Sequence, residues 1–196
     1  QPVGLEPQEE YRAPNEAMVN LAGVMNCIMC GACVSDCTVL EVDDAFIGPA
    51  ALAKAYRFVA DPRDGHSVDR LDALSEYSGI WDCTRCMECV EVCPKGVAPM
   101  DRIMSLRDEA MAAGFNNNTG ARHTEAFEEI VDHSGSLDEF KLPMKTFGML
   151  GMPLNFIPVA LRALAKGKIP PIIHPSIPGV EKVQHIIDKI KEDKEK

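Results

Sequence analysis

The cysteines of this chain fall into two bursts, and this feature constrains the fold more than any other. Each burst has the spacing C-x2-C-x2-C-x3-C, and corresponding cysteines of the two bursts are 56 residues apart. The first burst contains Cys27, Cys30, Cys33 and Cys37, and the second contains Cys83, Cys86, Cys89 and Cys93. Disulfides that cross-link a fold would be scattered along it. Thiols clustered in this way indicate bound metal in a reducing compartment.

This spacing is typical of bacterial proteins with two iron–sulfur clusters, in which the fourth cysteine of each burst binds the other cluster. Three thiolates at three-residue steps can wrap around one side of an iron–sulfur cube, and the fourth points away. We assign one [4Fe-4S] cluster to Cys27, Cys30, Cys33 and Cys93. We assign the second [4Fe-4S] cluster to Cys83, Cys86, Cys89 and Cys37. The alternative is a zinc-stabilised adaptor with two four-cysteine zinc sites, but zinc usually takes two separated cysteine pairs.

Composition narrows the class of protein. Apolar residues make up 46% of the 196 residues, which is enough for a buried core, and the net charge of −10 excludes nucleic acid as the expected partner. The acidic first 16 residues do not resemble a secretory signal. The longest uncharged stretch, residues 17–35, carries two asparagines and three of the clustered cysteines, so we expect no membrane span of its own. These features predict a cytoplasmic location, or a peripheral one on the inner face of the membrane.

Apolar residues recur at helical spacing, and no alternating strand pattern is present, so we expect an all-α fold. Helices are predicted over residues 15–26, 48–60, 67–78, 99–114, 119–133, 137–142, 158–166 and from 180 onward, with Asn15 and Ser67 as N-terminal caps. The predicted organisation is a linker at 1–14, a helical two-cluster ferredoxin domain at 15–115 and a helical C-terminal extension at 116–196 that docks a partner. Because the chain begins with glutamine, we expect it to be trimmed or part of a longer polypeptide.

The two bursts differ in the residues between their cysteines. The first has the small or apolar residues Ile28, Met29, Gly31 and Ala32, and the second has Thr84, Arg85, Met87 and Glu88. Hydrogen bonds to sulfur, positive charge and solvent exposure raise the reduction potential of a cluster. We therefore expect the cluster of the second burst to have the higher potential and to be the exit for electrons. The alternative is that Thr84 and Arg85 are merely solvated loop residues.

The sequence contains no catalytic motif. It has no nucleophile elbow, no glycine-rich phosphate loop and no H-E-x-x-H zinc motif, and its histidines are scattered. Clusters whose irons are all held by cysteine have no open position for a substrate. We therefore predict electron transfer, with no catalytic residue in this chain.

Motifs in and between the bursts resemble one known family. They are Cys27-Ile-Met-Cys-Gly-Ala-Cys33, Phe46-Ile-Gly-Pro-Ala50, Ala55-Tyr-Arg-Phe58, Asp61-Pro-Arg-Asp64, Arg70-Leu-Asp72 and Cys93-Pro-Lys-Gly96. In this order and spacing, over about residues 20–110, they resemble the C-terminal helical ferredoxin domain of the succinate dehydrogenase/fumarate reductase iron-sulfur subunit. The resemblance implies an electron-transfer subunit that lies between a flavoprotein subunit and a quinone- or thiol-linked partner. That partner would be a membrane anchor or a cysteine-rich subunit like those of heterodisulfide reductases.

The chain also departs from the common quinone-linked members of that family. Those members lack a counterpart of Cys86 and hold a [3Fe-4S] cluster, which here would fall on Cys37, Cys83 and Cys89. The presence of Cys86 predicts a second [4Fe-4S] cluster and is similar to the C-type subunit of heterodisulfide reductase and to thiol- or methylmenaquinol-linked fumarate reductases. Residues 38–44 contain no tryptophan, so the sequence does not predict a quinone pocket. The family's N-terminal [2Fe-2S] domain has no counterpart upstream of Cys27.

Overall fold

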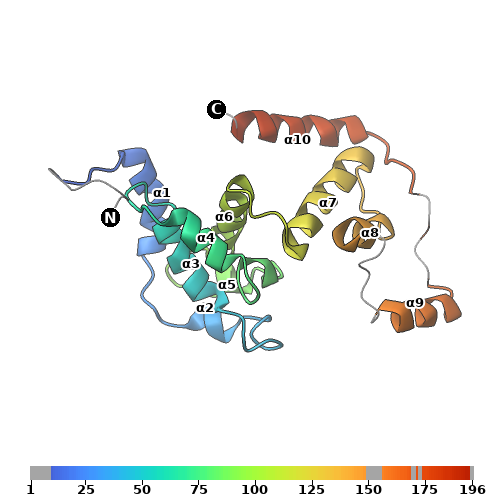
Figure 1. The fold of residues 1–196 in the computed structure, drawn as a ribbon, viewed down its shortest axis with the longest axis horizontal. Helices are drawn as coiled ribbons and strands as arrows, with labels where there is room; N and C mark the ends of the chain where they lie inside the picture. Colours follow the sequence, from blue (N-terminus) through green and yellow to red (C-terminus); the bar gives the residue numbers. More distant parts are fainter. Residues whose placement is uncertain (1–9, 149–155, 169–170, 172–173, 195–196) are drawn as a thin grey trace. The chain divides into compact units, whose positions relative to one another are not determined.

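The computed structural model describes residues 10–148, 156–168, 171 and 174–194. Every regular element in these ranges is a helix (Figure 1), which confirms the predicted all-α class. The chain divides into two compact units, residues 1–116 and 117–196.

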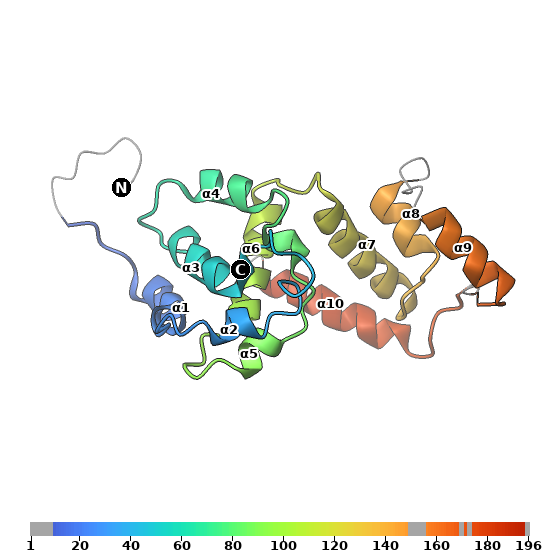
Figure 2. The same cartoon turned by 90° about the horizontal axis from the view of Figure 1, so that it is seen from below.

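The first unit contains all eight cysteines and is built around a pair of long helices. Its helices are α1 (Asn15–Met25), α2 (Ala32–Ser35), α3 (Gly48–Val59), α4 (Ser67–Leu74), the 3-10 turn η1 (Ile80–Asp82), α5 (Glu88–Glu91) and α6 (Pro99–Ala112). Helix α3 packs along α6, and α1, α2 and α4 pack against α3 (Figure 2). Pro49 and Pro99 lie in the first turns of α3 and α6, where a missing N–H costs nothing. The α3–α6 pair therefore supports the two cysteine loops.

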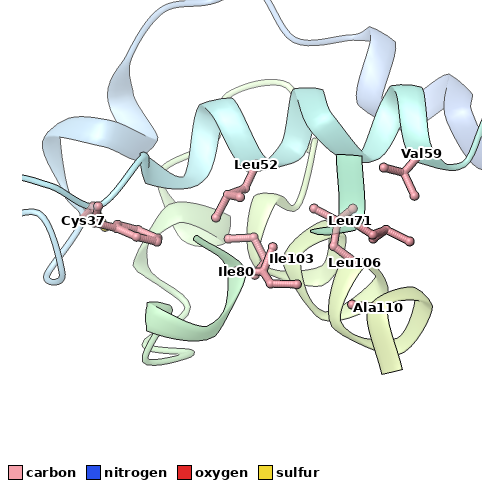
Figure 3. Close-up of a cluster of buried hydrophobic side chains, with 9 residues drawn as sticks. Cys37, Leu52, Val59, Leu71, Ile80, Ile103, Leu106 and Ala110 are labelled. Atoms are coloured by element: carbon pink, nitrogen blue, oxygen red, sulfur yellow. The ribbon is translucent and has the colours of Figure 1, made fainter. Parts of the chain in front are cut away.

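Aliphatic side chains fill the space between these two helices (Figure 3). Leu52 of α3 meets Ile103 and Leu106 of α6, and Ile80 of η1 closes the cluster. The remaining members of this core are Cys37, Phe46, Val59, Leu71 and Ala110. Leu52, Ile80 and Leu106 have no exposed surface, and burying one such side chain contributes about 1.5–3 kcal/mol. One cysteine of the first burst thus belongs to the hydrophobic core.

Two helix starts differ from the predicted caps. Asn15 is the first helical residue of α1, and Pro14 holds the cap position without a side-chain hydrogen bond. His66 precedes α4, and Ser67 lies inside it. The Ser67 hydroxyl instead donates to the carbonyl of Val59, 3.2 Å away at the end of α3. This serine ties two helices together, so its hydroxyl is used for a tertiary contact and not for a cap.

The second unit contains α7 (Thr119–Ser134), α8 (Lys141–Phe147), α9 (Phe156–Ala165) and α10 (Val180–Lys194). Helix α7 packs against both α8 and α10. The side chain of Asn118 caps α7 by accepting from the N–H of Ala121 at 2.8 Å. Asp138 accepts from the backbone N–H groups of Phe140 and Lys141. This buried carboxylate starts α8 at Lys141, later than the predicted 137.

Helix α9 exposes its apolar side chains within this unit. Ile157, Val159, Leu161 and Leu164 are all more than half exposed. In the described parts of the chain, no helix combines the length and the apolar character that crossing a bilayer needs.

Candidate metal centre

The two cysteine loops have the same backbone conformation. Met29 and Gly31 have positive φ angles of 59° and 79°, and the residues 56 positions later, Arg85 and Met87, have φ angles of 59° and 70°. A left-handed residue between cysteines turns successive N–H groups toward one side, and such concave N–H arrangements are found at many iron–sulfur sites. The loops therefore repeat in structure although their side chains do not.

A single helical turn follows each loop at the equivalent position. Helix α2 begins directly after Gly31 and α5 directly after Met87, and the two helices pack against each other. The carbonyl of Gly31 accepts from Ser35 at 3.0 Å, and that of Met87 accepts from Glu91 at 3.2 Å. Each turn carries the third cysteine of its burst and delivers the fourth just beyond its end. The contact between α2 and α5 brings the two bursts together.

Thiols from both bursts line one apolar hollow. Cys27, Cys30 and Cys33 of the first loop share this hollow with Cys93 of the second burst. The other lining residues are Ile28, Met29, Gly31, Ala32, Ala50, Ala53, Pro94, Lys95, Val97 and Pro99. Burial raises the pKa of the Cys33 thiol, and the charges of Cys27, Cys93 and Cys30 raise it further. The structure thus places near one another the four cysteines predicted for the first cluster.

Backbone groups surround the thiol that comes from the other burst. The N–H of Val97 donates to Sγ of Cys93 at 3.3 Å. Burial acts to raise the pKa of this thiol, but hydrogen bonds from the N–H groups of residues 95–98 outweigh it, and the pKa is lowered. Arg102 of α6 donates to the carbonyl of Val97 at 3.3 Å. The thiolate of Cys93 is therefore stabilised by the segment that leads into α6.

The other four cysteines also influence one another. Burial raises the pKa of Cys83, and the charges of Cys86 and Cys37 raise it further. Burial raises the pKa of Cys89 to about 11, with contributions from Cys83 and Cys86. Cys37 and Cys89 are buried, and Cys86 is exposed. Cys37 of the first burst therefore lies near enough to Cys83 for its charge to affect the pKa of Cys83, as the predicted second set requires.

Polar groups distinguish this second set from the first. Hydrogen bonding from Thr38 is the largest cause of a lowered pKa at Cys86, and Thr84 contributes to the same effect. The charge of Arg107 on α6 acts to lower the pKa of Cys83. Sequence reasoning identified Thr84 but missed Thr38 and Arg107. Thr38 directly follows the fourth cysteine and could have been found, whereas Arg107 gave no local signal.

The thiols of the first set line a hollow instead of meeting at one point. Among the described residues, which include every cysteine, no three His, Cys, Asp or Glu side chains are placed to hold a single metal ion. A polynuclear cluster needs its ligand sulfurs farther apart than one tetrahedral ion does, because each sulfur binds a different iron. The donors present, four thiols around an apolar hollow with backbone N–H groups nearby, fit an iron–sulfur cube.

Comparison with known families supports this chemistry. Residues 23–97 match the 4Fe-4S dicluster domain. That range begins four residues before the first cysteine and ends four residues after the last. The class of the first unit is therefore a helical domain for iron–sulfur clusters.

Individual relatives narrow the class further. The chain is 30% identical over 149 residues, 75% of its length and 46% of the relative, to the 8-methylmenaquinol:fumarate reductase iron-sulfur subunit of Wolinella succinogenes. It is 39% identical over 106 residues to the succinate dehydrogenase iron-sulfur subunit of Coxiella burnetii, covering 54% of this chain and 45% of that subunit. A fumarate reductase iron-sulfur subunit of Mycobacterium tuberculosis is 40% identical over 94 residues, 48% of this chain and 38% of the relative.

The chain thus contains a 4Fe-4S dicluster domain and is similar to succinate dehydrogenase and fumarate reductase iron-sulfur subunits, the resemblance that its motifs predicted. It spans less than half the length of these three relatives.

Proposed function

We propose that this chain holds two [4Fe-4S] clusters and passes single electrons between them as a subunit of a succinate dehydrogenase/fumarate reductase-type complex. The observation that carries the proposal is the sharing of thiols between loops, because Cys93 of the second burst lines the hollow of the first. A [4Fe-4S] cluster supplies reversible one-electron chemistry when it is bound. With four thiols for each cluster, no position is left for a substrate.

The protein's own part is to hold the thiols, exclude water and fix the two sites close together. The α3–α6 core supports both loops, and the packing of α2 on α5 sets the distance between them. Apolar residues line the first hollow. Cys33 of the first set and Cys89 of the second are near enough for the charge of one to raise the pKa of the other. This proximity suits electron transfer between the sites.

Unequal potentials would give the transfer a direction. The hydroxyls of Thr38 and Thr84 and the charge of Arg107 act on thiols of the second set, and such groups stabilise the reduced form of a cluster. Their presence supports the expectation that the cluster of Cys83, Cys86, Cys89 and Cys37 has the higher potential and is the exit for electrons.

The names of the relatives suggest the partners. Their complexes reduce fumarate or oxidise succinate, so we expect a flavoprotein subunit on one side and a quinone- or thiol-linked partner on the other. The exposed aliphatic side chains of α9 supply an apolar surface for one of them. The sequence also predicts a partner surface in the apolar, Met-rich stretch 147–152, which lies mostly outside the described residues. Docking in this way would place the chain at the cytoplasmic face of a membrane-associated complex.

The docking surface can be tested without removing a domain. Leu161→Glu with Leu164→Glu on α9 should abolish co-purification with a partner from the native host. Lys191 of α10 pairs with Glu128 of α7 at 3.2 Å, so Lys191→Gln is a control that leaves the apolar surface intact. Retention of the partner by the double variant would contradict this role of α9.

The competing assignment is the C-type subunit of a heterodisulfide reductase. Cys86 favours this subunit over the quinone-linked succinate dehydrogenases and fumarate reductases, which lack a counterpart of Cys86. A flavoprotein partner with fumarate-dependent turnover supports our proposal. A cysteine-rich partner with thiol activity supports the alternative.

Elemental analysis tests the clusters themselves. Anaerobically purified protein should contain about eight iron and eight acid-labile sulfide per chain, as two cubes require. A colourless preparation that contains zinc in place of iron would favour a zinc-stabilised adaptor and refute the proposal. About seven iron per chain would indicate a [3Fe-4S] second cluster on Cys37, Cys83 and Cys89.

A further inference from the structure

A buried arginine reaches from α6 to the segment that leads into the second cysteine loop. The Arg107 side chain donates from Nε to the carbonyl of Ile80 at 2.8 Å. Its Nη2 donates to the carbonyls of Trp81 at 3.1 Å and Cys83 at 2.7 Å. The guanidinium also lies over the ring of Trp81, 5.4 Å from its centroid. One rigid fork therefore fixes the backbone of η1 and of Cys83 against the core helix.

The charge of this arginine is buried without a direct ion pair to a carboxylate of the described residues. Only 6% of Arg107 is exposed, and among the described residues no Asp or Glu lies within ion-pair distance of it. Burial, reinforced by the nearby charge of Arg85, lowers its pKa to about 10. At neutral pH the side chain is therefore still a cation.

A buried cation without a direct ion-pair partner costs several kcal/mol. The charge of Asp82 favours the cationic form of Arg107, but its carboxylate accepts from the N–H of Ser78 at 2.7 Å. The Arg107 guanidinium donates to the carbonyl of Cys83 at 2.7 Å, so its charge lies beside the second set and acts on that set through Cys83.

We propose that Arg107 is a positioning residue that raises the reduction potential of the second cluster and holds Cys83 in place. This inference rests on the proposed function, because it needs a cluster on Cys83, Cys86, Cys89 and Cys37. Reduction adds one negative charge to the site, and a fixed positive charge in a dry environment favours that state.

The same helix provides a matched control for the first site. Arg102 lies five residues earlier on α6, half-buried, and donates to the carbonyl of Val97, whose N–H donates to Cys93 Sγ. Its guanidinium lies over Tyr56, 5.5 Å from the ring centroid. Arg102 and Arg107 thus have similar roles, because each donates to a backbone carbonyl beside one set of thiols. Arg63, half-buried and paired with Asp61 at 2.7 Å, lies outside both predicted sets.

The test is a redox titration followed by EPR on the anaerobically purified full chain, with iron and sulfide content measured for each variant. Arg107→Met should lower the ratio of reduced to oxidised second cluster at least tenfold at a fixed solution potential, a shift of about 59 mV for one electron. The first cluster should keep its potential. Arg102→Met should leave the second potential unchanged, and Arg63→Met should move neither. An unchanged second potential in Arg107→Met with full iron content would overturn the proposal.

Arg107→Lys tests the charge where the methionine variant fails to hold its clusters. Lysine keeps the positive charge but cannot reproduce the fork of donors, whereas glutamine keeps a donor and has no charge. The second potential of Arg107→Lys should therefore be higher than that of Arg107→Gln at neutral pH. Equal second potentials in these two variants would overturn the role of the charge. Loss of the second cluster alone supports the positioning role, and loss of both clusters refutes it. Absence of both signals from the unaltered chain would instead refute the proposed function.

Discussion

The two cysteine loops have the same backbone conformation but lie in different environments. Met29 and Arg85 share a φ of 59°, and α2 and α5 begin at equivalent positions. Yet the first set lies in an apolar hollow, whereas hydrogen bonds from threonines and a buried arginine act on the second. The same cysteine spacing thus accompanies the same backbone conformation, whereas the residues outside the spacing differ in polarity. On the function proposed above, those residues set how readily each cluster accepts an electron.

The largest effect is expected from variants that test whether the fourth cysteine of each burst binds the cluster of the other burst. Cys93→Ser should damage the first cluster, because Cys93 lies with Cys27, Cys30 and Cys33. The double variant Cys30→Ser with Cys93→Ser should then lose iron from the first cluster alone and keep the second cluster intact. Cys86→Ser with Cys93→Ser should damage both clusters. Iron and sulfide analysis with EPR would show the reverse pattern if each burst held its own cluster.

Loss of the exposed second cysteine should be milder. Cys86 and its counterpart Cys30 are the two exposed thiols, so each can be removed without disturbing the core. Cys86→Ser should convert the second site to an EPR-active [3Fe-4S] species while the first signal persists. Cys30→Ser should do the same at the first site. If Cys86→Ser leaves both signals unaltered, Cys86 is not a ligand.

Thr38 should tune the second site by a smaller amount than Arg107. Thr38→Val keeps the shape of the side chain but removes the hydroxyl, the largest cause of the lowered pKa at Cys86. We expect a lower potential at the second cluster, with no change at the first, in redox-titrated EPR. Thr84→Val should have a smaller effect, because its hydrogen bond is the weaker contribution. A shift confined to the first cluster would reverse our assignment of the two environments.

The left-handed residues at the loop ends provide the smallest test. Met87 has a φ of 70° where its counterpart Gly31 has 79°. A residue with a Cβ is strained there by about 1–2 kcal/mol, so Met87→Gly should stabilise the chain by about 1 kcal/mol. Gly31→Ala should destabilise it by a similar amount, because a Cβ at this position meets no atom within 4 Å and only the backbone is strained. Anaerobic thermal unfolding measures both, and effects of the opposite sign would contradict this account.

The sequence predicted the helical fold and the dicluster domain, because periodicity and cysteine spacing are local patterns. The ligand sets for the two clusters stay predictions, which the grouping of the thiols supports. Helices α2 and α5 were not predicted, since four residues are too few to show a helical period. The left-handed conformation of Met87 was also hidden, because only glycine signals it in a sequence.

Contacts between residues that are distant in the sequence explain the other differences between the predicted and the observed structure. Ser67 bonds Val59, eight residues earlier, and so does not cap α4. Arg107 binds carbonyls 24 to 27 residues earlier, and backbone acceptors leave no trace in the side-chain pattern. Such partners become visible only when the helices are placed in space.

Cys37 is both a member of the hydrophobic core and a thiol of the second set. Oxidative loss of iron from that set would leave an ionisable sulfur amid Phe46 and Ile80, where the packing depends on apolar contact. Damage by oxygen would therefore loosen the scaffold as well as stop conduction.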